Sequence, residues 1–200
     1  MPLTRTELVE GLGAIADHME EVKDRLNELD GKLGDGDLGV SMVRGGREVK
    51  AILAGLPPEI GESLMQVAQA FTRISGSSYG TLVATGLLAA AKATRGRSEV
   101  PWSEVSPLLR GAFEAMQKRG KAELGNKTVL DTLDAAATAT EGLDDPAAIL
   151  AAAKKATAET MDRMRDRPAQ IGRARIFADK SVGLDDPGMV AFWEMLQGLA

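Results

Sequence analysis

Three aspartates and four glycines fall within the ten residues 30–39, DGKLGDGDLG, where a long helical pattern stops. Carboxylates spaced this closely repel one another unless a cation lies among them. The glycines let the backbone turn tightly enough for Asp30, Asp35 and Asp37 to converge on one point. Oxygen ligands suit a hard divalent cation such as magnesium, which binds proteins together with nucleotide phosphates. The segment therefore predicts a metal cradle; the alternative is a solvated turn.

Two familiar motifs are excluded at this segment. Gly34, Gly36 and Gly39 match the spacing of a dinucleotide-binding fingerprint, but that motif needs a preceding strand, and here an amphipathic helix precedes it. An EF-hand loop that starts at Asp35 would have Gly46 at its twelfth position, where a bidentate glutamate is required. A site with two or three carboxylates and open positions for water and phosphate oxygens remains.

A second polar loop, SGSSYGT at residues 75–81, separates two helical patterns. Ser75, Gly76 and Ser77 offer backbone N–H groups and hydroxyls ahead of a helix N-terminus, a combination that can cradle phosphate. The alternative is a tight helix–helix turn built from small residues. The segment lacks the Gly-Lys-Ser/Thr ending of a Walker loop.

Two later loops also carry groups that suit a nucleotide. The segment GNKTVLD at residues 125–131 opens a helix with Lys127 and Thr128, although Asn126 or Thr128 could merely cap that helix. Arg173 follows in a late loop, and its planar guanidinium matches phosphate oxygens. The alternatives are a surface arginine and, at Asp186, an ordinary N-cap.

The elements that must position these loops are helices. Apolar residues 8, 12, 15, 19, 22, 26 and 29 form one stripe, which predicts a helix that ends near Asp30. We expect further helices near 40–53, 59–74, 82–93, 102–118, 128–141, 146–166 and 187–199. Only residues 174–182 are ambiguous, and no segment shows sustained strand periodicity. The expected fold is all-α: one domain over residues 1–200, an antiparallel bundle or closed barrel of eight helices.

Composition narrows the possible functions. A net charge of −5 leaves no basic stripe for general nucleic-acid binding, and the absence of cysteine excludes thiolate chemistry. His18, the single histidine, lies at the polar edge of the first helical stripe, so a histidine-based catalytic triad is not expected. No signal peptide or membrane span is evident, which predicts a cytoplasmic protein that binds neither membrane nor nucleic acid.

Taken together, the loops resemble one family in their order and spacing: the L subunit, or ADP-binding subunit, of dihydroxyacetone kinase. The resemblance covers nearly the whole chain, and its first block is the most specific. The residues that carry it are Leu26-Asn27-Glu28-Leu29-Asp30, Gly34-Asp35-Gly36-Asp37, Gly39, Met42, Arg44-Gly45, Ser75-Gly76, Tyr79-Gly80-Thr81, Lys127-Thr128, Asp131, Leu133, Gly172-Arg173-Ala174, Ser181, Gly183 and Asp186-Pro187-Gly188.

The resemblance implies an eight-helix barrel with the nucleotide site at one end. It implies that Asp30, Asp35 and Asp37 bind two magnesium ions that bridge the phosphates of ADP or ATP. The nucleotide-binding positions that it implies are Leu38, Ser41, Met42, Ser75, Gly76, Ser77, Thr128, Val129, Arg173, Asp186 and Gly188.

The resemblance also implies partners. A separate K-type subunit would hold the ketose covalently through its own histidine, and this chain would bring the phosphoryl donor. That donor is either ATP or a tightly held ADP recharged by a phosphotransferase-system subunit. Self-association is compatible with either arrangement.

Three positions depart from the family pattern. Leu38 and Leu184 stand where the family usually has histidine, and Ser41 stands where it usually has asparagine. These changes leave open the nucleotide affinity and whether the ketose is dihydroxyacetone or a tetrulose. Three other functions also remain open: a related kinase that phosphorylates fatty acids, a nucleotide-sensing module that docks on a transcription factor, and a helical interaction domain without a ligand.

Overall fold

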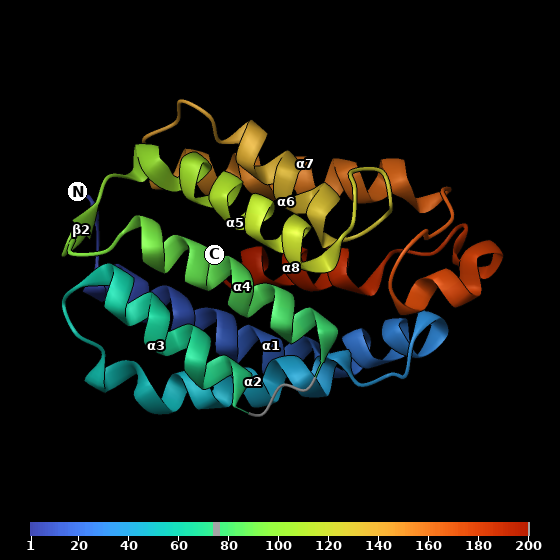
Figure 1. Cartoon of the computed structure of the whole chain (residues 1–200), viewed down its shortest axis with the longest axis horizontal. Helices are drawn as coiled ribbons and strands as arrows, with labels where there is room; N and C mark the ends of the chain where they lie inside the picture. Colours follow the sequence, from blue (N-terminus) through green and yellow to red (C-terminus); the bar gives the residue numbers. More distant parts are fainter. Residues whose placement is uncertain (74–76, 200) are drawn as a thin grey trace.

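Eight α-helices build the chain in the computed structural model, which describes residues 1–73 and 77–199 (Figure 1). Two very short strands, β1 (Leu3–Thr4) and β2 (Glu99–Val100), pair antiparallel near the N-terminus. The helices are α1 (Arg5–Leu33), α2 (Leu38–Ile52), α3 (Ile60–Thr72), α4 (Ser78–Ala93), α5 (Val105–Gly120), α6 (Val129–Ala139), α7 (Pro146–Arg165) and α8 (Pro187–Gln197), with 3₁₀ segments η1 (Leu53–Gly55), η2 (Trp102–Glu104) and η3 (Arg173–Ser181).

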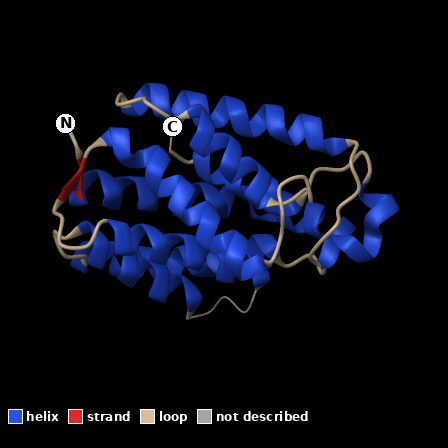
Figure 2. Ribbon diagram, turned by 45° about the horizontal axis from the view of Figure 1, so that its top comes forward, coloured by secondary structure: helices blue, strands red, loops and turns tan. Residues whose placement is uncertain are grey.

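Successive helices run in opposite directions, so their connections alternate between the two ends of the molecule (Figures 1 and 2). Each helix packs against the next, and α8 packs against α1, which closes the ring. The connections α1–α2, α3–α4, α5–α6 and α7–α8 therefore gather at one end. These are the polar loops that the sequence singles out, so the topology brings them together.

The helix starts follow the local chemistry of the chain. Thr4 and Glu7 form a capping box at α1, and Thr128 and Asp131 form another at α6. An aspartate N-cap followed by proline opens both α7 and α8. These caps satisfy backbone N–H groups that have no partner inside the helix.

The main core lies inside the ring, where α1, α2, α3 and α8 meet. Met19 and Leu26 of α1 are almost fully buried, as the apolar stripe predicts. They pack with Met42, Phe71 and Val190 from the neighbouring helices. Burial of this kind holds the helices at fixed positions, and so it fixes the loops at their ends. Among the described residues, every helix is too short or too polar to cross a bilayer.

The all-α, eight-helix prediction is confirmed, but several boundaries differ. Helix α1 continues to Leu33, so Asp30 lies inside the last turn of the helix instead of at its end. Helix α4 begins at Ser78, earlier than expected, and the ambiguous stretch 174–182 falls largely within the 3₁₀ segment η3. The β1–β2 pair was not predicted, because two-residue strands carry no period-two pattern.

Gly39 sets the approach of α2 to α1, and we predict that Gly39→Ala destabilises the fold. An added Cβ would lie 2.1 Å from the Lys23 carbonyl oxygen and 2.9 Å from Asn27 Oδ1. The Lys23 carbonyl belongs to the backbone of α1 and cannot move away without distorting that helix. The free energy of unfolding should therefore fall by about 1–3 kcal/mol in urea denaturation. Gly111→Ala is the matched control, since no atom lies within 4 Å of its Cβ position inside α5. Equal effects of the two substitutions would contradict the close packing of α1 and α2.

Candidate functional site

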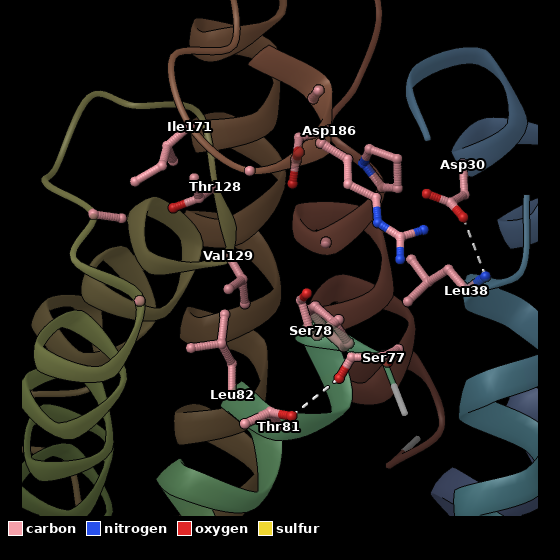
Figure 3. Close-up of a pocket in the computed structure, with 18 of the residues that line it drawn as sticks. Asp30, Leu38, Ser77, Ser78, Thr81, Leu82, Thr128, Val129, Ile171 and Asp186 are labelled. Carbon is pink, nitrogen blue, oxygen red and sulfur yellow. Dashed lines mark hydrogen bonds between the residues drawn. The ribbon is translucent and has the colours of Figure 1, made fainter. Parts of the chain in front are cut away.

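A cavity of about 500 Å³ opens at the end of the ring where the four polar loops meet (Figure 3). Each loop or its flanking helix contributes to the wall. Asp30 and Leu38 lie on one side, and Thr128, Val129 and Ile171 lie on the opposite side. The carboxylates of Asp35 and Asp37 lie close to that of Asp30. Ser77 and Asp186 lie between the two sides in the same view. The cavity therefore has an acidic end and a more apolar end.

The acidic end is built by the α1–α2 connection. One carboxylate oxygen from each of Asp30, Asp35 and Asp37 lies within 4.8 Å of the others. Asp30 is half-buried, whereas the other two acids are exposed. Gly36 has a φ of +77°, which favours glycine and turns the loop back on itself. The convergence expected from the sequence is present, and three carboxylates at this spacing fit the oxygen ligand set of a divalent cation.

Asp30 also organises the loop. Its Oδ2 accepts hydrogen bonds from the backbone N–H groups of Asp37, at 2.9 Å, and Leu38, at 3.2 Å. Asn27 Oδ1, one turn earlier on α1, accepts from the N–H of Val40 at 3.1 Å. The N-cap residue of α2, Asp37, makes no capping bond with its own side chain. Two side chains of α1 thus cap α2, and the Asp37 carboxylate remains available to the cavity.

Arg173 lies beside the acidic cluster, at the start of η3, which packs against α1. It is exposed on η3, and its guanidinium forms an ion pair with Asp35. The sequence suggested that this arginine would contact a phosphate. The ion pair places a fixed positive charge beside the acids, at the point where an anionic group would approach a cation held by them.

The phosphate-cradle segment is described from Ser77 onward, and its predicted members Ser75 and Gly76 lie outside the described residues. Ser77 is the N-cap of α4, and its Oγ accepts a hydrogen bond from the N–H of Gly80 at 2.9 Å. Thr81 Oγ1 donates to the Ser77 carbonyl at 3.1 Å (Figure 3). The N-terminus of α4 therefore forms part of the cavity wall, with the positive end of its helix dipole there.

Thr128 and Val129 form the more apolar end, together with Leu82, Met116 and Ile171. Thr128 also caps α6, because its Oγ1 accepts from the N–H of Leu130 at 3.2 Å. Both interpretations of this residue hold together: it caps the helix and it faces the cavity. A flat, largely apolar ring system would find complementary surface here.

The remaining predicted positions divide between the cavity and the core. Leu38 and Gly188 line the cavity, as does Asp186. Met42 instead lies in the main core at 3% exposure, and Ser41 is half-buried on α2. Neither Ser41 nor Met42 is among the residues that form the described cavity wall.

Asp186 is an acid of the cavity wall whose pKa departs strongly from its ordinary value. It caps α8, and its Oδ1 accepts from the N–H of Met189 at 2.9 Å. Burial raises the pKa of Asp186 to about 6; backbone N–H groups and the Lys127 charge work against that shift. The Tyr79 hydroxyl lies nearby, is buried, and finds no hydrogen-bond partner among the described residues. Burial, with the negative charge of Asp186, raises the pKa of Tyr79, so its hydroxyl stays protonated.

His18 is not part of the cavity wall. Its Nε2 lies 2.8 Å from Oε2 of Glu194, a buried carboxylate on α8 that also pairs with Arg25. The helical pattern predicted that His18 lies at the polar edge of the apolar stripe, and its side chain is 24% exposed. The buried acid it contacts was not predicted, because Glu194 looks like an ordinary polar position of a helix.

The fold and the cavity together define a class of protein: a closed ring of antiparallel helices with an acidic cleft at one end. A profile of the DAK2 domain matches residues 32–200. The ADP-binding subunit DhaL of the PEP-dependent dihydroxyacetone kinase of Escherichia coli (strain K12) is 30% identical over 206 residues, covering 100% of this chain and 98% of the relative. DhaL of the PTS-dependent kinase of Lactococcus lactis is 32% identical over 187 residues, covering 93% and 91% of the two chains.

Solved structures show the same fold. The native dihydroxyacetone kinase of C. freundii superposes with a TM-score of 0.79 and 24% identity, over 100% of this chain and 35% of that one. The form of that kinase in complex with AMP-PNP and Mg²⁺ gives a TM-score of 0.77 at 23% identity, over 34% of its length. This chain thus spans about a third of that kinase. The chain belongs to the DAK2 domain family.

We predict that Asp186→Asn changes the pH dependence of stability. A carboxyl with a pKa of about 6 in the folded state and 3.8 unfolded stabilises the fold below pH 3.8, and this contribution is lost as pH rises through 6. Asparagine caps helices equally well but carries no charge. The variant should therefore gain up to about 2 kcal/mol relative to wild type between pH 4 and pH 7, after allowance for screening at the cavity mouth.

Urea denaturation across that pH range measures the difference. Asp145→Asn is the control, because Asp145 caps α7 with the same Asp-Pro pattern but is exposed. A constant difference between wild type and Asp186→Asn at every pH would contradict a raised pKa at Asp186.

His18→Ala should lower stability without affecting ligand binding. The substitution removes one partner of the buried Glu194, so the free energy of unfolding should fall by about 1–2 kcal/mol. Denaturation and a titration with Mg-ADP measure the two effects. Glu21→Ala, which removes the exposed partner of the same histidine at 3.4 Å, should change neither. A large loss of ligand binding in His18→Ala would show that the histidine has a role at the cavity.

Proposed function

We propose that this chain binds ADP or ATP with magnesium and is the phosphoryl-donor subunit of a ketose kinase. The ketose, dihydroxyacetone or a related sugar, would be held on a separate K-type subunit. The observation that carries the proposal is the convergence of three carboxylates in the wall of a cavity large enough for a nucleotide. Its relatives in E. coli and L. lactis are named ADP-binding subunits of dihydroxyacetone kinases, and a structural neighbour holds AMP-PNP and Mg²⁺.

Electrostatics supports this assignment. A nucleotide polyphosphate cannot approach Asp30, Asp35 and Asp37 without intervening cations, because like charges at this distance repel strongly. We propose two magnesium ions held by these acids, which when bound neutralise phosphate oxygens. Arg173, which pairs with Asp35, supplies a fixed positive charge beside the acids, and the α4 N-terminus supplies oriented N–H donors.

The two ends of the cavity would then bind different parts of the nucleotide. The apolar surface of Val129, Leu82 and Ile171 would contact the nucleoside, while the acidic end would hold the phosphates through metal. Phosphoryl transfer demands mainly positioning and charge neutralisation, so the chain needs no nucleophile of its own. We accordingly propose no catalytic histidine here.

The phosphoryl donor can be either ATP or a bound ADP that is recharged, and the two differ in how tightly the protein holds the nucleotide. The relatives described as PEP-dependent or PTS-dependent support ADP that stays bound and is recharged by a phosphotransferase-system subunit. Mass spectrometry of the purified protein for retained ADP distinguishes this from ATP that exchanges at each turnover. Retained stoichiometric ADP supports the recharged-cofactor arrangement, and a nucleotide-free protein supports ATP.

We predict that Asp35→Asn and Asp37→Asn each abolish magnesium-dependent binding of ADP and leave the fold intact. Each change removes a charged ligand atom without altering side-chain size. Isothermal titration with ADP and magnesium measures the affinity, and circular dichroism with urea denaturation monitors the fold. Asp24→Asn is the control, because Asp24 is an exposed acid of α1 outside the cluster. Unchanged affinity in both cluster variants would eliminate the metal cradle.

Reconstitution with a K-type subunit tests the kinase assignment itself. Phosphate should be transferred to dihydroxyacetone or a tetrulose only when both chains, nucleotide and magnesium are present. A chain that binds Mg-ADP but supports no transfer with K-type partners would instead be a nucleotide-sensing module.

A further inference from the structure

Lys127 is the largest fully buried side chain of the described residues, at 1% exposure. Its Nζ donates hydrogen bonds to three backbone carbonyls: those of Arg165 at 2.8 Å, Arg167 at 2.8 Å and Ser181 at 2.7 Å. An ammonium group has three N–H donors, so all of them are used within the protein. No carboxylate of the described residues lies within 4 Å of this nitrogen. Burying a cation is costly unless hydrogen bonds replace its contacts with water. The ammonium group is therefore stable only where all three carbonyls can accept from it, which fixes its position.

The backbone at Lys127 adopts a left-handed conformation, with a φ of 62°, just before the α6 N-cap. This conformation is uncommon for a residue with a side chain. Burial lowers the pKa of Lys127, while the negative charges of Asp185, Asp186 and Asp166 oppose that shift. These nearby acids favour the ammonium form that the three carbonyls require.

The three carbonyls lie at the two ends of one segment. Arg165 ends α7, where the last carbonyls of a helix lack internal partners, and Ser181 ends η3. The same junction is reinforced by the N–H of Gly183, which donates to the Arg165 carbonyl at 2.9 Å. Ser181 Oγ accepts from the N–H of Ala169 at 2.7 Å. The lysine therefore closes residues 166–181 into a loop whose ends are tied at a single nitrogen.

That loop carries the late part of the cavity wall. Ile171 and Arg173 lie within it, and Asp186 follows five residues after its end. Lys127 itself is not among the residues that line the cavity. The sequence allowed this lysine to face a nucleotide, but the structure commits all three of its donors elsewhere, so any effect on the ligand must pass through other residues.

We propose that Lys127 is a positioning residue of the nucleotide site: its buried ammonium ties the two ends of segment 166–181 and thereby holds Arg173 and Asp186 at the cavity. The part of this inference that concerns ligand affinity rests on the proposed function. The part that concerns loop closure does not, and it can be measured without any nucleotide.

Lys127→Met tests the proposal, because methionine fills most of the same volume without a charge or donors. Hydrogen exchange of the ligand-free protein should accelerate at residues 166–181 by tenfold or more, while α1 to α3 keep their protection. The dissociation constant for Mg-ADP should rise at least tenfold. Lys118→Met, at an exposed position of α5, is the matched control and should change neither measurement.

A double-mutant cycle separates positioning from general stability. If Lys127 acts through Arg173, then Lys127→Met should weaken Mg-ADP binding less in an Arg173→Gln background than in wild type. A purely structural lysine would give equal losses in both backgrounds at temperatures well below unfolding. If Lys127→Met does not fold, Ser181→Ala provides a milder test of the same junction. It removes the Oγ that accepts from the Ala169 N–H and keeps the carbonyl that Lys127 contacts, so both effects should appear at smaller size.

The outcomes distinguish the two hypotheses. Faster exchange in the loop with unchanged affinity, or weaker affinity with unchanged exchange, would overturn the positioning role. A wild-type protein that binds no ADP would instead overturn the proposed function, and the exchange data would still decide whether Lys127 closes the loop.

Discussion

Repulsion among three carboxylates at one end of a helical ring is the constraint on which the account depends. Asp30, Asp35 and Asp37 are brought within 4.8 Å of one another by a glycine-rich turn and by hydrogen bonds from α2 to Asp30. A protein gains no stability from gathering like charges, so the arrangement calls for positive charge in their midst. Arg173 supplies part of that charge through its ion pair with Asp35. A divalent cation would supply the rest, and with it the means to hold an anionic ligand.

The ring positions this cluster through topology. Because consecutive helices alternate in direction, every second connection falls at the same end, and residues separated by more than a hundred positions come to share one wall. The core between α1, α2, α3 and α8 holds the helix ends still, and close contacts such as that of Gly39 with α1 leave little freedom for them to shift. The loops can then vary in detail while the acids and the opposite wall keep their separation.

Much of this could be predicted from the sequence, because it depends on local patterns. The stripe that contains Met19 and Leu26 has helical spacing, and the Asp-Pro pairs mark helix starts, so the eight helices were predictable. The acidic cluster was predictable too, since its members lie within eight residues. Details that depend on distant partners were not: Asp30 caps the next helix from inside α1, Met42 packs into the core, and Glu194 meets His18 across two helices. Lys127 shows the limit most clearly, because nothing local in GNKTVLD reveals three carbonyl acceptors near residues 165 and 181.

Calorimetric titration of the wild-type protein with ADP, first in magnesium and then in excess EDTA, tests the central claim most directly. If cations mediate between the acidic cluster and the phosphates, ADP should bind tightly with magnesium and its affinity should fall by orders of magnitude without it. Equal affinity under both conditions, or no binding in either, would contradict the account.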